Sequence, residues 1–297
     1  MFLVKTGACS IILGSGHYGS YYPTKKKKLL KITKISENHN EIKYLDEIRK
    51  IQNYSNYYAI PDRESFILDP AEDFYKYIKD LVKKDELSIF TGPLECFYVD
   101  NAGSKDLLDT LNELIMFDDK RLWNSYKTIL NFTKQIMGAL RFLHQNNICH
   151  LDIKPENIMV DVYNRKFKLI DFGFASKEPF DDYLSYIRGT PGYFPSDFAN
   201  YKVTNWLPKI EANDLSLVNN EYPMKTNRKL VYKIDSYCFG RVLFYIKHIY
   251  TDKRTNSCFN MCSDTQTIIT LNDIIANLIE SDVYKRSTIE QCMYTYF

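Results

Sequence analysis

The chain has 297 residues, of which 45% are hydrophobic and 26% charged, an ordinary composition for a globular protein with room for two lobes. Its 39 basic and 37 acidic residues leave a formal net charge of +2, so electrostatics do not favour a dedicated nucleic-acid or membrane-surface binder. No run of 18 or more apolar residues occurs, which excludes an ordinary membrane-spanning helix.

The first hundred residues are rich in short strands. Apolar or β-branched runs between turn residues predict them at Ser10–Leu13, Ser20–Tyr22, Leu29–Ile35, Ser65–Leu68 and Glu95–Val99. One helix is predicted over Glu41–Ile51, because apolar residues recur there at three-residue spacing. A polar insertion, Ala71–Lys84, is predicted to be helical as well.

From about Asp106 onward the pattern changes to helices. Apolar residues at three- and four-residue spacing predict a long buried helix over Trp123–Gln145 and further helices over Ile234–Ile249 and Leu271–Leu278. A strand-rich first part followed by a helical remainder predicts an α+β protein with two unequal lobes. We expect a small lobe of about residues 1–100 and a larger lobe of about residues 101–297, divided near Asp100–Gly103.

A glycine-rich segment lies between the first two predicted strands, where Leu13 is followed by Gly14, Gly16 and Gly19. Glycines allow backbone amides to approach phosphate oxygens. The same spacing also suits a plain hairpin or a dinucleotide-binding turn. The latter requires a following helix, whereas Ser20–Tyr22 is predicted to be a strand, which disfavours dinucleotide binding.

The next predicted strand carries Lys31 between apolar neighbours. In an alternating strand this lysine points toward a cleft and can meet phosphates as a point charge. A surface lysine is the alternative, and Lys34 competes for the same role. We expect a carboxylate of the following helix to hold Lys31, with Glu41 as the first candidate and Glu47 as the second.

The long helix is followed by the octet His150-Leu151-Asp152-Ile153-Lys154-Pro155-Glu156-Asn157. In this spacing Asp152 can orient a hydroxyl and accept its proton, while Lys154 neutralises charge on a transferring phosphoryl group. Asn157 offers an amide oxygen to Mg²⁺. Fourteen residues later, Asp171 ends a short apolar strand and offers a hard oxygen ligand suited to bridging Mg²⁺ to phosphates.

Taken in order, these segments resemble the eukaryotic-type serine/threonine protein kinase family. The resemblance implies a two-lobed protein-kinase-like fold that binds ATP and Mg²⁺. It implies the following site residues: Gly14, Gly16 and Gly19 in the glycine-rich loop, Lys31 as the ATP-anchoring lysine with Glu41 as its partner, Asp152 and Lys154 as catalytic residues, and Asn157 and Asp171 as metal ligands. Leu13, Tyr21, Leu29 and Tyr98–Ala102 are expected around the adenine, and Asp106 near the ribose.

Downstream segments extend the resemblance. Gly189–Asp197 is similar to the end of the family's activation segment, and Asp235–Gly240 to the start of the core helix that follows it. Arg286 matches the arginine that pairs with the acid closing the activation segment, here Asp197. Lys154 together with Thr190 resembles the serine/threonine branch rather than the tyrosine branch.

Three departures from the family pattern matter. Leu151 stands where the family usually has an arginine that pairs with a phosphorylated activation segment. We therefore expect activity without phosphorylation of Tyr183, Ser185 or Tyr186. Only ten residues separate Lys31 from Glu41, fewer than is usual, and residues 205–227 are predicted to be a polar inserted loop.

The sequence thus predicts a single protein kinase domain over residues 1–297 that phosphorylates Ser or Thr hydroxyls of protein substrates. The first alternative is a catalytically weak kinase-fold scaffold or binding module, and the second is a small-molecule phosphotransferase. Scaffolds of this fold typically lose the lysine, the catalytic aspartate or a metal ligand, whereas all are present here. We expect an intracellular, soluble protein of the cytoplasm (of the host cell if the chain is viral) with no nucleic-acid or membrane partner; a monomer is compatible with the sequence.

Overall fold

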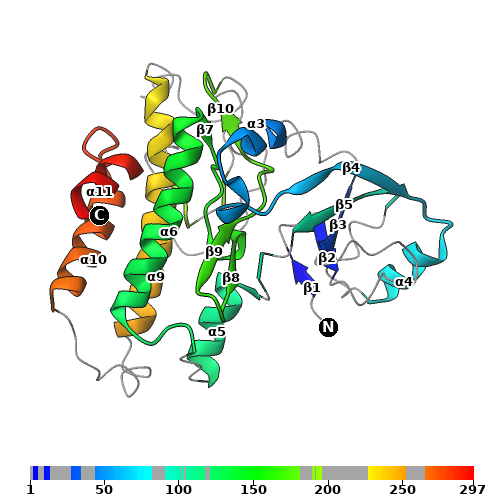
Figure 1. Ribbon diagram of the computed structural model, residues 1–297, viewed down its shortest axis with the longest axis horizontal. Helices are drawn as coiled ribbons and strands as arrows, with labels where there is room; N and C mark the ends of the chain where they lie inside the picture. The colour runs from blue at the N-terminus through cyan, green and yellow to red at the C-terminus, as the bar shows by residue number, and fades with distance from the viewer. Residues whose placement is uncertain are drawn as a thin grey trace.

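The computed structural model describes residues 3–5, 10–13, 28–34, 44–81, 91–100, 102–103, 105–117, 121–180, 189–190, 192–195, 227–251 and 265–297. These residues form a small lobe built on an antiparallel sheet and a larger, mainly helical lobe (Figure 1). The predicted α+β class and its two unequal lobes are confirmed.

The small lobe contains a five-stranded antiparallel sheet in the order β1-β2-β3-β5-β4. Its strands are β1 (Leu3–Lys5), β2 (Ser10–Leu13), β3 (Lys28–Lys34), β4 (Pro61–Leu68) and β5 (Leu94–Asp100). Four of the five predicted strands appear with small shifts at their ends, and Ser20–Tyr22 lies outside the described residues. In the central strand β3, Lys31 is opposite Ile12 on one side and Phe97 on the other.

Two helices accompany this sheet. Helix α4 (Asp73–Leu81) packs Phe74, Tyr75 and Ile78 against Leu30 and Ile32 of β3, which confirms the predicted helical insertion. Helix α3 (Leu45–Lys50) lies within the helix predicted over Glu41–Ile51, of which residues 41–43 are outside the described residues.

The large lobe is organised around two long helices, α6 (Tyr126–Gln145) and α9 (Tyr232–Thr251), with α10 (Thr265–Leu278) and α11 (Ile289–Tyr296) beside them (Figure 1). Ser125 caps α6 by accepting a hydrogen bond from Thr128 N. Helix α5 (Leu107–Phe117) follows the sheet of the small lobe, and the 3₁₀ turn η7 (Arg228–Val231) precedes α9. None of the described helices is long and apolar enough to cross a bilayer.

Two small sheets in the large lobe carry the predicted site. One has the order β6-β8-β9, from β6 (Lys105–Asp106), β8 (Ile158–Asp161) and β9 (Lys166–Leu169). The other pairs β7 (Ile148–Cys149) with β10 (Ser176–Lys177). The loop between β7 and β8 contains the octet, including the 3₁₀ turn η4 (Pro155–Asn157), and the loop between β9 and β10 contains Asp171. Adjacent strands thus present both loops at one edge.

The chain between α3 and β4 attaches the small lobe to the large one. After the 3₁₀ turn η2 (Tyr54–Asn56), Ala59 N donates to Leu169 O at 3.1 Å, and Leu169 N donates to Tyr57 O at 2.9 Å. The fully buried Tyr58 donates its hydroxyl to Ala139 O of α6 at 2.6 Å. Burial raises the pKa of this phenol far above its usual range. The segment is therefore fixed on the strand that leads to Asp171.

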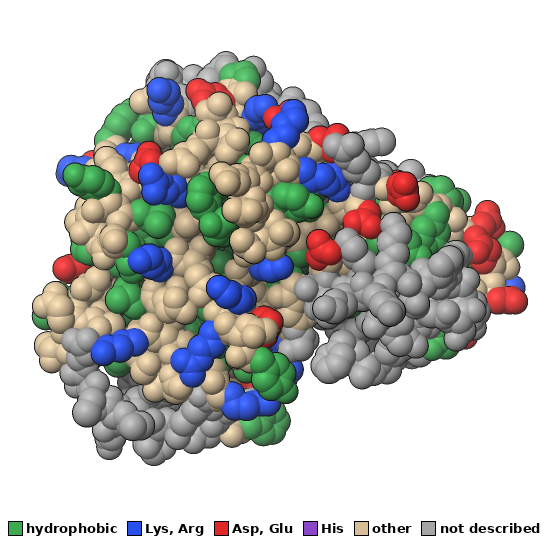
Figure 2. All heavy atoms as spheres, viewed as in Figure 1, with side chains coloured by type: hydrophobic (Ala, Val, Ile, Leu, Met, Phe, Trp, Pro, Cys, Tyr) green, Lys and Arg blue, Asp and Glu red, His purple; other side chains and the backbone are tan. Residues whose placement is uncertain are grey.

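Charged side chains are unevenly distributed over one face of the molecule. On the face shown in Figure 2, Lys and Arg side chains are scattered over the large lobe, whereas acidic side chains gather on the small lobe. Exposed acids of that lobe include Glu64, Asp69 and Glu72.

Candidate active site

A buried carboxylate at the start of α9 supports the octet from below. Asp235 Oδ2 accepts hydrogen bonds from His150 N and His144 Nε2, both at 2.9 Å, and Asp235 Oδ1 accepts one from Leu151 N at 2.7 Å. Burial alone would raise the pKa of Asp235, but the bond from His144 and the nearby donors reverse this and lower it. An ionised acceptor therefore holds the backbone just before Asp152.

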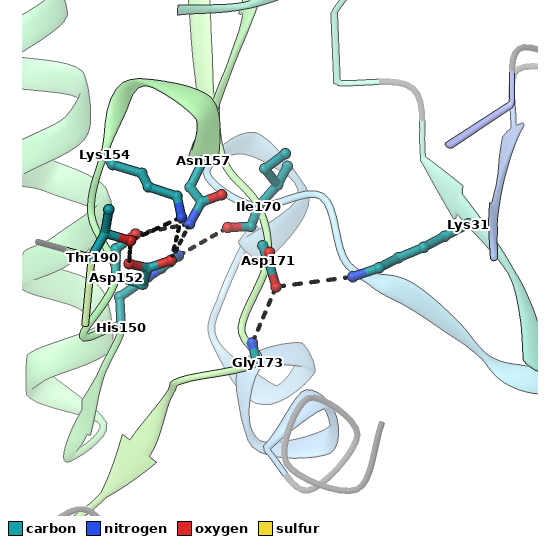
Figure 3. A network of polar contacts seen from close by, with 9 residues as sticks. All are labelled: Lys31, His150, Asp152, Lys154, Asn157, Ile170, Asp171, Gly173 and Thr190. Carbon is teal, nitrogen blue, oxygen red and sulfur yellow. Dashed lines mark hydrogen bonds and ion pairs between the residues drawn. The ribbon is translucent and has the colours of Figure 1, made fainter. Parts of the chain in front are cut away.

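Asp152 lies at the centre of a compact polar network (Figure 3). Its Oδ1 accepts a hydrogen bond from Thr190 Oγ1 at 2.5 Å, and its Oδ2 lies 3.0 Å from Lys154 Nζ. Lys154 Nζ also donates to Thr190 Oγ1 at 2.9 Å. The two residues predicted to be catalytic are thus side by side, and a hydroxyl group already occupies hydrogen-bonding distance from the carboxylate.

Asn157 is oriented by the same carboxylate. Its Nδ2 donates to Asp152 O at 2.8 Å and to Asp152 Oδ2 at 2.9 Å. Its Oδ1 is buried and, among the described residues, accepts no hydrogen bond. A buried amide oxygen without a donor is costly unless something else satisfies it, and a cation would do so.

Asp171 is brought next to this loop by backbone bonds. Ile170 N donates to Asn157 O at 3.0 Å, and Ile170 O faces His150 Nε2 at 3.0 Å. Asp171 itself has a φ of 61°, in the left-handed region, and its Oδ1 accepts from Gly173 N at 3.3 Å. The two predicted metal ligands therefore lie in neighbouring loops, Asn157 just before β8 and Asp171 just after β9.

Lys31 reaches this acidic centre from the small lobe (Figure 3). Its Nζ lies 4.0 Å from Asp171 Oδ1, and its side chain is 6% exposed. The prediction placed Lys31 on a strand facing a cleft, and this burial fits that placement better than a surface lysine.

The predicted glycine-rich loop and the two predicted partners of Lys31 have different outcomes. Glu41, Gly14, Gly16 and Gly19 lie outside the described residues. The second candidate, Glu47, uses its Oε1 for Lys50 Nζ at 3.0 Å and its Oε2 for Lys177 Nζ at 3.2 Å. In this structure, therefore, both carboxylate oxygens of Glu47 are engaged by lysines other than Lys31.

An apolar cluster lies between the sheet and the large lobe, where the adenine pocket was predicted. Its buried members are Ala59, Val99, Ala102, Met159 and Ile170, and half-buried Leu29 packs against them. The sequence predicted Leu29 and the Tyr98–Ala102 segment but missed Ala59, Met159 and Ile170. Leu13 is the last residue of β2, where it is opposite Leu30 of β3.

Asp106, predicted near the ribose, lies at the junction of β6 and α5. It is 7% exposed, and its Oδ1 accepts a hydrogen bond from Asp109 N at 2.8 Å. Burial raises the pKa of this carboxyl to about 7 despite that bond. The group thus titrates near neutral pH.

Leu151 is 1% exposed and belongs to the core of the large lobe, and its φ is 65°. A non-glycine residue in this region is strained, and the bond from Leu151 N to Asp235 offsets the strain. The position that the family gives to a phosphate-binding arginine is therefore an apolar core position here.

Arg286 is buried at 1% exposure in the large lobe. Its Nε donates to Glu280 O at 2.8 Å, and its guanidinium lies 4.8 Å from the ring centre of Tyr237. Its predicted partner Asp197 is outside the described residues, as is the predicted insertion up to residue 226.

Sequence reasoning missed the supporting residues of the site. It placed Asp235 only at the start of a helix, and the one available signal was a carboxylate within an otherwise apolar helical pattern. It gave no role to Tyr58, because its partner is a backbone carbonyl 81 residues away.

A five-stranded antiparallel lobe above a helical lobe, with a lysine, a catalytic-type loop and two candidate metal ligands meeting between them, defines a protein with the protein kinase fold. The family model described as the protein kinase domain matches residues 10–297. The chain therefore belongs to the protein kinase family, and the resemblance noted from its motifs is confirmed.

Individual relatives are distant. The chain is 29% identical over 136 residues to the serine/threonine-protein kinase nekl-2 of Caenorhabditis elegans, covering 42% of this chain and 38% of that protein. It is 31% identical over 165 residues to the liver/testis isoform of the phosphorylase b kinase gamma catalytic chain of Mus musculus, covering 55% and 35%. The chain thus spans less than two fifths of the length of these relatives.

A solved structure shares the fold over nearly the whole chain. The Cydia pomonella granulovirus kinase PK-1 matches 99% of this chain and 91% of its own, with a TM-score of 0.55 at 15% identity. At this identity the likeness concerns the fold alone.

Proposed function

We propose that this protein is a Mg²⁺-dependent serine/threonine kinase that transfers the γ-phosphoryl group of ATP to hydroxyls of protein substrates. The observation that carries the proposal is the network in which Asp152 Oδ1 accepts a hydrogen bond from the Thr190 hydroxyl at 2.5 Å while Lys154 contacts both groups. A substrate Ser or Thr hydroxyl placed beside Asp152 would meet the same acceptor and the same cation. The serine/threonine kinases among the relatives support the same substrate chemistry.

The chain's own residues would contribute positioning and charge. Asp152 orients the attacking hydroxyl and takes its proton, and Lys154 stabilises negative charge on the transferring phosphoryl oxygens. Lys31 would hold the ATP phosphates from the small lobe, and the Leu29–Met159 cluster would bury the adenine. Catalysis of this kind requires little covalent chemistry from the protein.

The donor set fits Mg²⁺. Asn157 Oδ1 is a buried oxygen that lacks a hydrogen-bond donor among the described residues, and Asp171 offers a carboxylate in the neighbouring loop after β9. Both are hard oxygen ligands of the type that Mg²⁺ prefers. When bound, the ion would neutralise phosphate charge; Asn157 and Asp171 would hold it.

The test is transfer of phosphate from radiolabelled ATP to a Ser/Thr peptide mixture, with and without Mg²⁺. Asp152→Ala and Asp171→Ala should each lower the rate by at least about a hundredfold. Asp273→Ala, on an exposed position of α10, is the matched control and should retain the wild-type rate. Equal rates from all three variants would refute the kinase proposal and favour a binding module.

We further propose that the kinase does not depend on activation-segment phosphorylation, because the buried Leu151 cannot pair with a phosphate. Replacing Tyr183, Ser185 and Tyr186 together by Phe, Ala and Phe should therefore leave the rate within about twofold of wild type. Loss of activity in this triple variant would contradict the proposal.

A further inference from the structure

Helix α3 lies where the two lobes meet (Figure 1). Its buried residues Leu45 and Ile48 belong to the same core cluster as Leu169 and Phe172 of the large lobe. On its other side, Arg49 donates a hydrogen bond to Pro61 O at the start of β4, a strand of the small-lobe sheet. The helix therefore has contacts with both lobes.

One ion pair joins α3 to the segment that follows Asp171. Glu47 Oε2 lies 3.2 Å from Lys177 Nζ, and both side chains are a little more than one third exposed. Hydrogen bonds from Lys50 and then from Lys177 hold the pKa of Glu47 below its usual value, so the carboxylate is charged at neutral pH. Lys50 is on α3 itself, so only the contact with Lys177 crosses between elements.

The strand that contains Lys177 pairs with the strand that leads into the predicted catalytic loop. It is the last residue of β10, which pairs with β7 so that Lys177 is opposite Ile148 and Ser176 is opposite Cys149. Strand β7 runs directly into His150 and Asp152. A charge on α3 is thus connected through one strand pair to the residues that would perform the reaction.

We propose that Glu47 and Lys177 are positioning residues that hold α3 against β10. They thereby keep Lys31 of the small lobe close to Asp171 of the large lobe. This inference rests on the proposed kinase function. In this inference, two charges that belong to the chain hold α3 to the segment that follows Asp171. No phosphate is needed for this contact, and Leu151 provides no cation that could bind one.

A half-exposed ion pair usually contributes little to stability. Here its effect is expected on geometry instead, because Lys31 Nζ and Asp171 Oδ1 come from different lobes and lie 4.0 Å apart. We expect a rotation of α3 to shift β4 through the contact of Arg49 with Pro61 O and so to lengthen this distance, whereas the core contacts of Leu45 and Ile48 would keep the protein folded.

The experiment compares Glu47→Gln and Lys177→Gln with the matched control Lys50→Gln, which removes the other partner of Glu47 without touching the inter-element contact. We expect the first two variants to lower kcat/KM for ATP by about 1.5- to 5-fold, the range for one half-exposed pair, with no loss of thermal stability. Lys50→Gln should remain at the wild-type value.

The decisive variant reverses the pair. In the Lys50→Gln background, Glu47→Lys with Lys177→Glu should recover kcat/KM to within about 1.5-fold, whereas either reversal alone should lower it below the Gln variants. A single reversal that is harmless, or a double reversal no better than the single ones, would overturn the inference.

Failure of this inference is distinguishable from failure of the proposed function. If Asp152→Ala is inactive while Glu47→Gln retains the full kcat/KM, the protein is a kinase and the positioning role is wrong. If Asp152→Ala is as active as wild type, the kinase proposal itself is wrong.

Discussion

Replacing Asp235 by Asn tests whether the buried carboxylate under the octet holds the loop in place. The side chain is 0% exposed and accepts hydrogen bonds from His150 N, Leu151 N and His144 Nε2. Asn has nearly the same shape but only one acceptor oxygen, so its amide NH₂ must face at least one of these donors. The variant therefore removes acceptors without leaving a cavity.

The size of the effect follows from the number of bonds lost. If the Asn oxygen faces Leu151 N, the bonds from His150 N and His144 are lost; in the other orientation the bond from Leu151 N is lost. A hydrogen bond to a charged group contributes about 1.5–3 kcal/mol, and a buried unsatisfied donor costs about 1–3 kcal/mol. We expect a destabilisation of about 2–4 kcal/mol, together with a drop in kcat of more than about tenfold, because the backbone at either His150 or Leu151 loses its anchor.

Urea unfolding followed by tryptophan fluorescence measures the first quantity, and steady-state phosphate transfer measures the second. Asp273→Asn makes the same chemical change on an exposed helix position and should alter neither. A destabilisation below about 0.5 kcal/mol with unchanged kcat would refute the view that Asp235 anchors the loop.

Two further predictions concern Asp106 and Leu151. The pKa of Asp106 is about 7 in the folded protein and ordinarily 3.8, so wild type loses folding stability as pH rises between these values. Asp106→Asn has no such titration and should therefore gain stability relative to wild type as pH rises. Between pH 5.5 and 8 the gain should be about 2 kcal/mol by urea unfolding, and a difference that does not vary with pH would contradict it. At Leu151, whose φ is 65°, Gly should be more stable than Ala by about 1 kcal/mol, the reverse of the usual order, although both lose the buried side chain. Unfolding midpoints that rank Ala above Gly would show that this backbone is not strained.

The elements that sequence predicted well are those in which local pattern and burial agree. The long helix α6 appears within three residues of its prediction, since its apolar spacing matches one buried face and Ser125 supplies a cap. The helix predicted over Glu41–Ile51 ends at Lys50 instead, because Ile51 is extended although it continues the apolar spacing. Periodicity alone does not show where a helix ends.

The site residues also divide into those that the sequence predicts and those that it does not. Asp152, Lys154, Asn157 and Asp171 are identifiable because their chemistry requires fixed spacings along the chain, and the structure brings them together. Their supports are not identifiable in this way, since Asp235 and Tyr58 act on backbone atoms that are distant in sequence. A backbone partner leaves no side-chain pattern to detect.

The contacts around Leu151 connect the loop's stability to its control. A switch controlled by phosphorylation requires a cation that binds the phosphate. Here that position is occupied by the core side chain of Leu151, and the backbone N–H of Leu151 donates to the ionised, fully buried Asp235. Such a contact forms when the protein folds and does not depend on modification. The Glu47–Lys177 pair, if it positions α3 as proposed, is of the same kind, since both charges belong to the chain. Both supports of the candidate site would then be permanent, so regulation would have to act through ATP, substrate or a partner rather than through assembly of the catalytic loop.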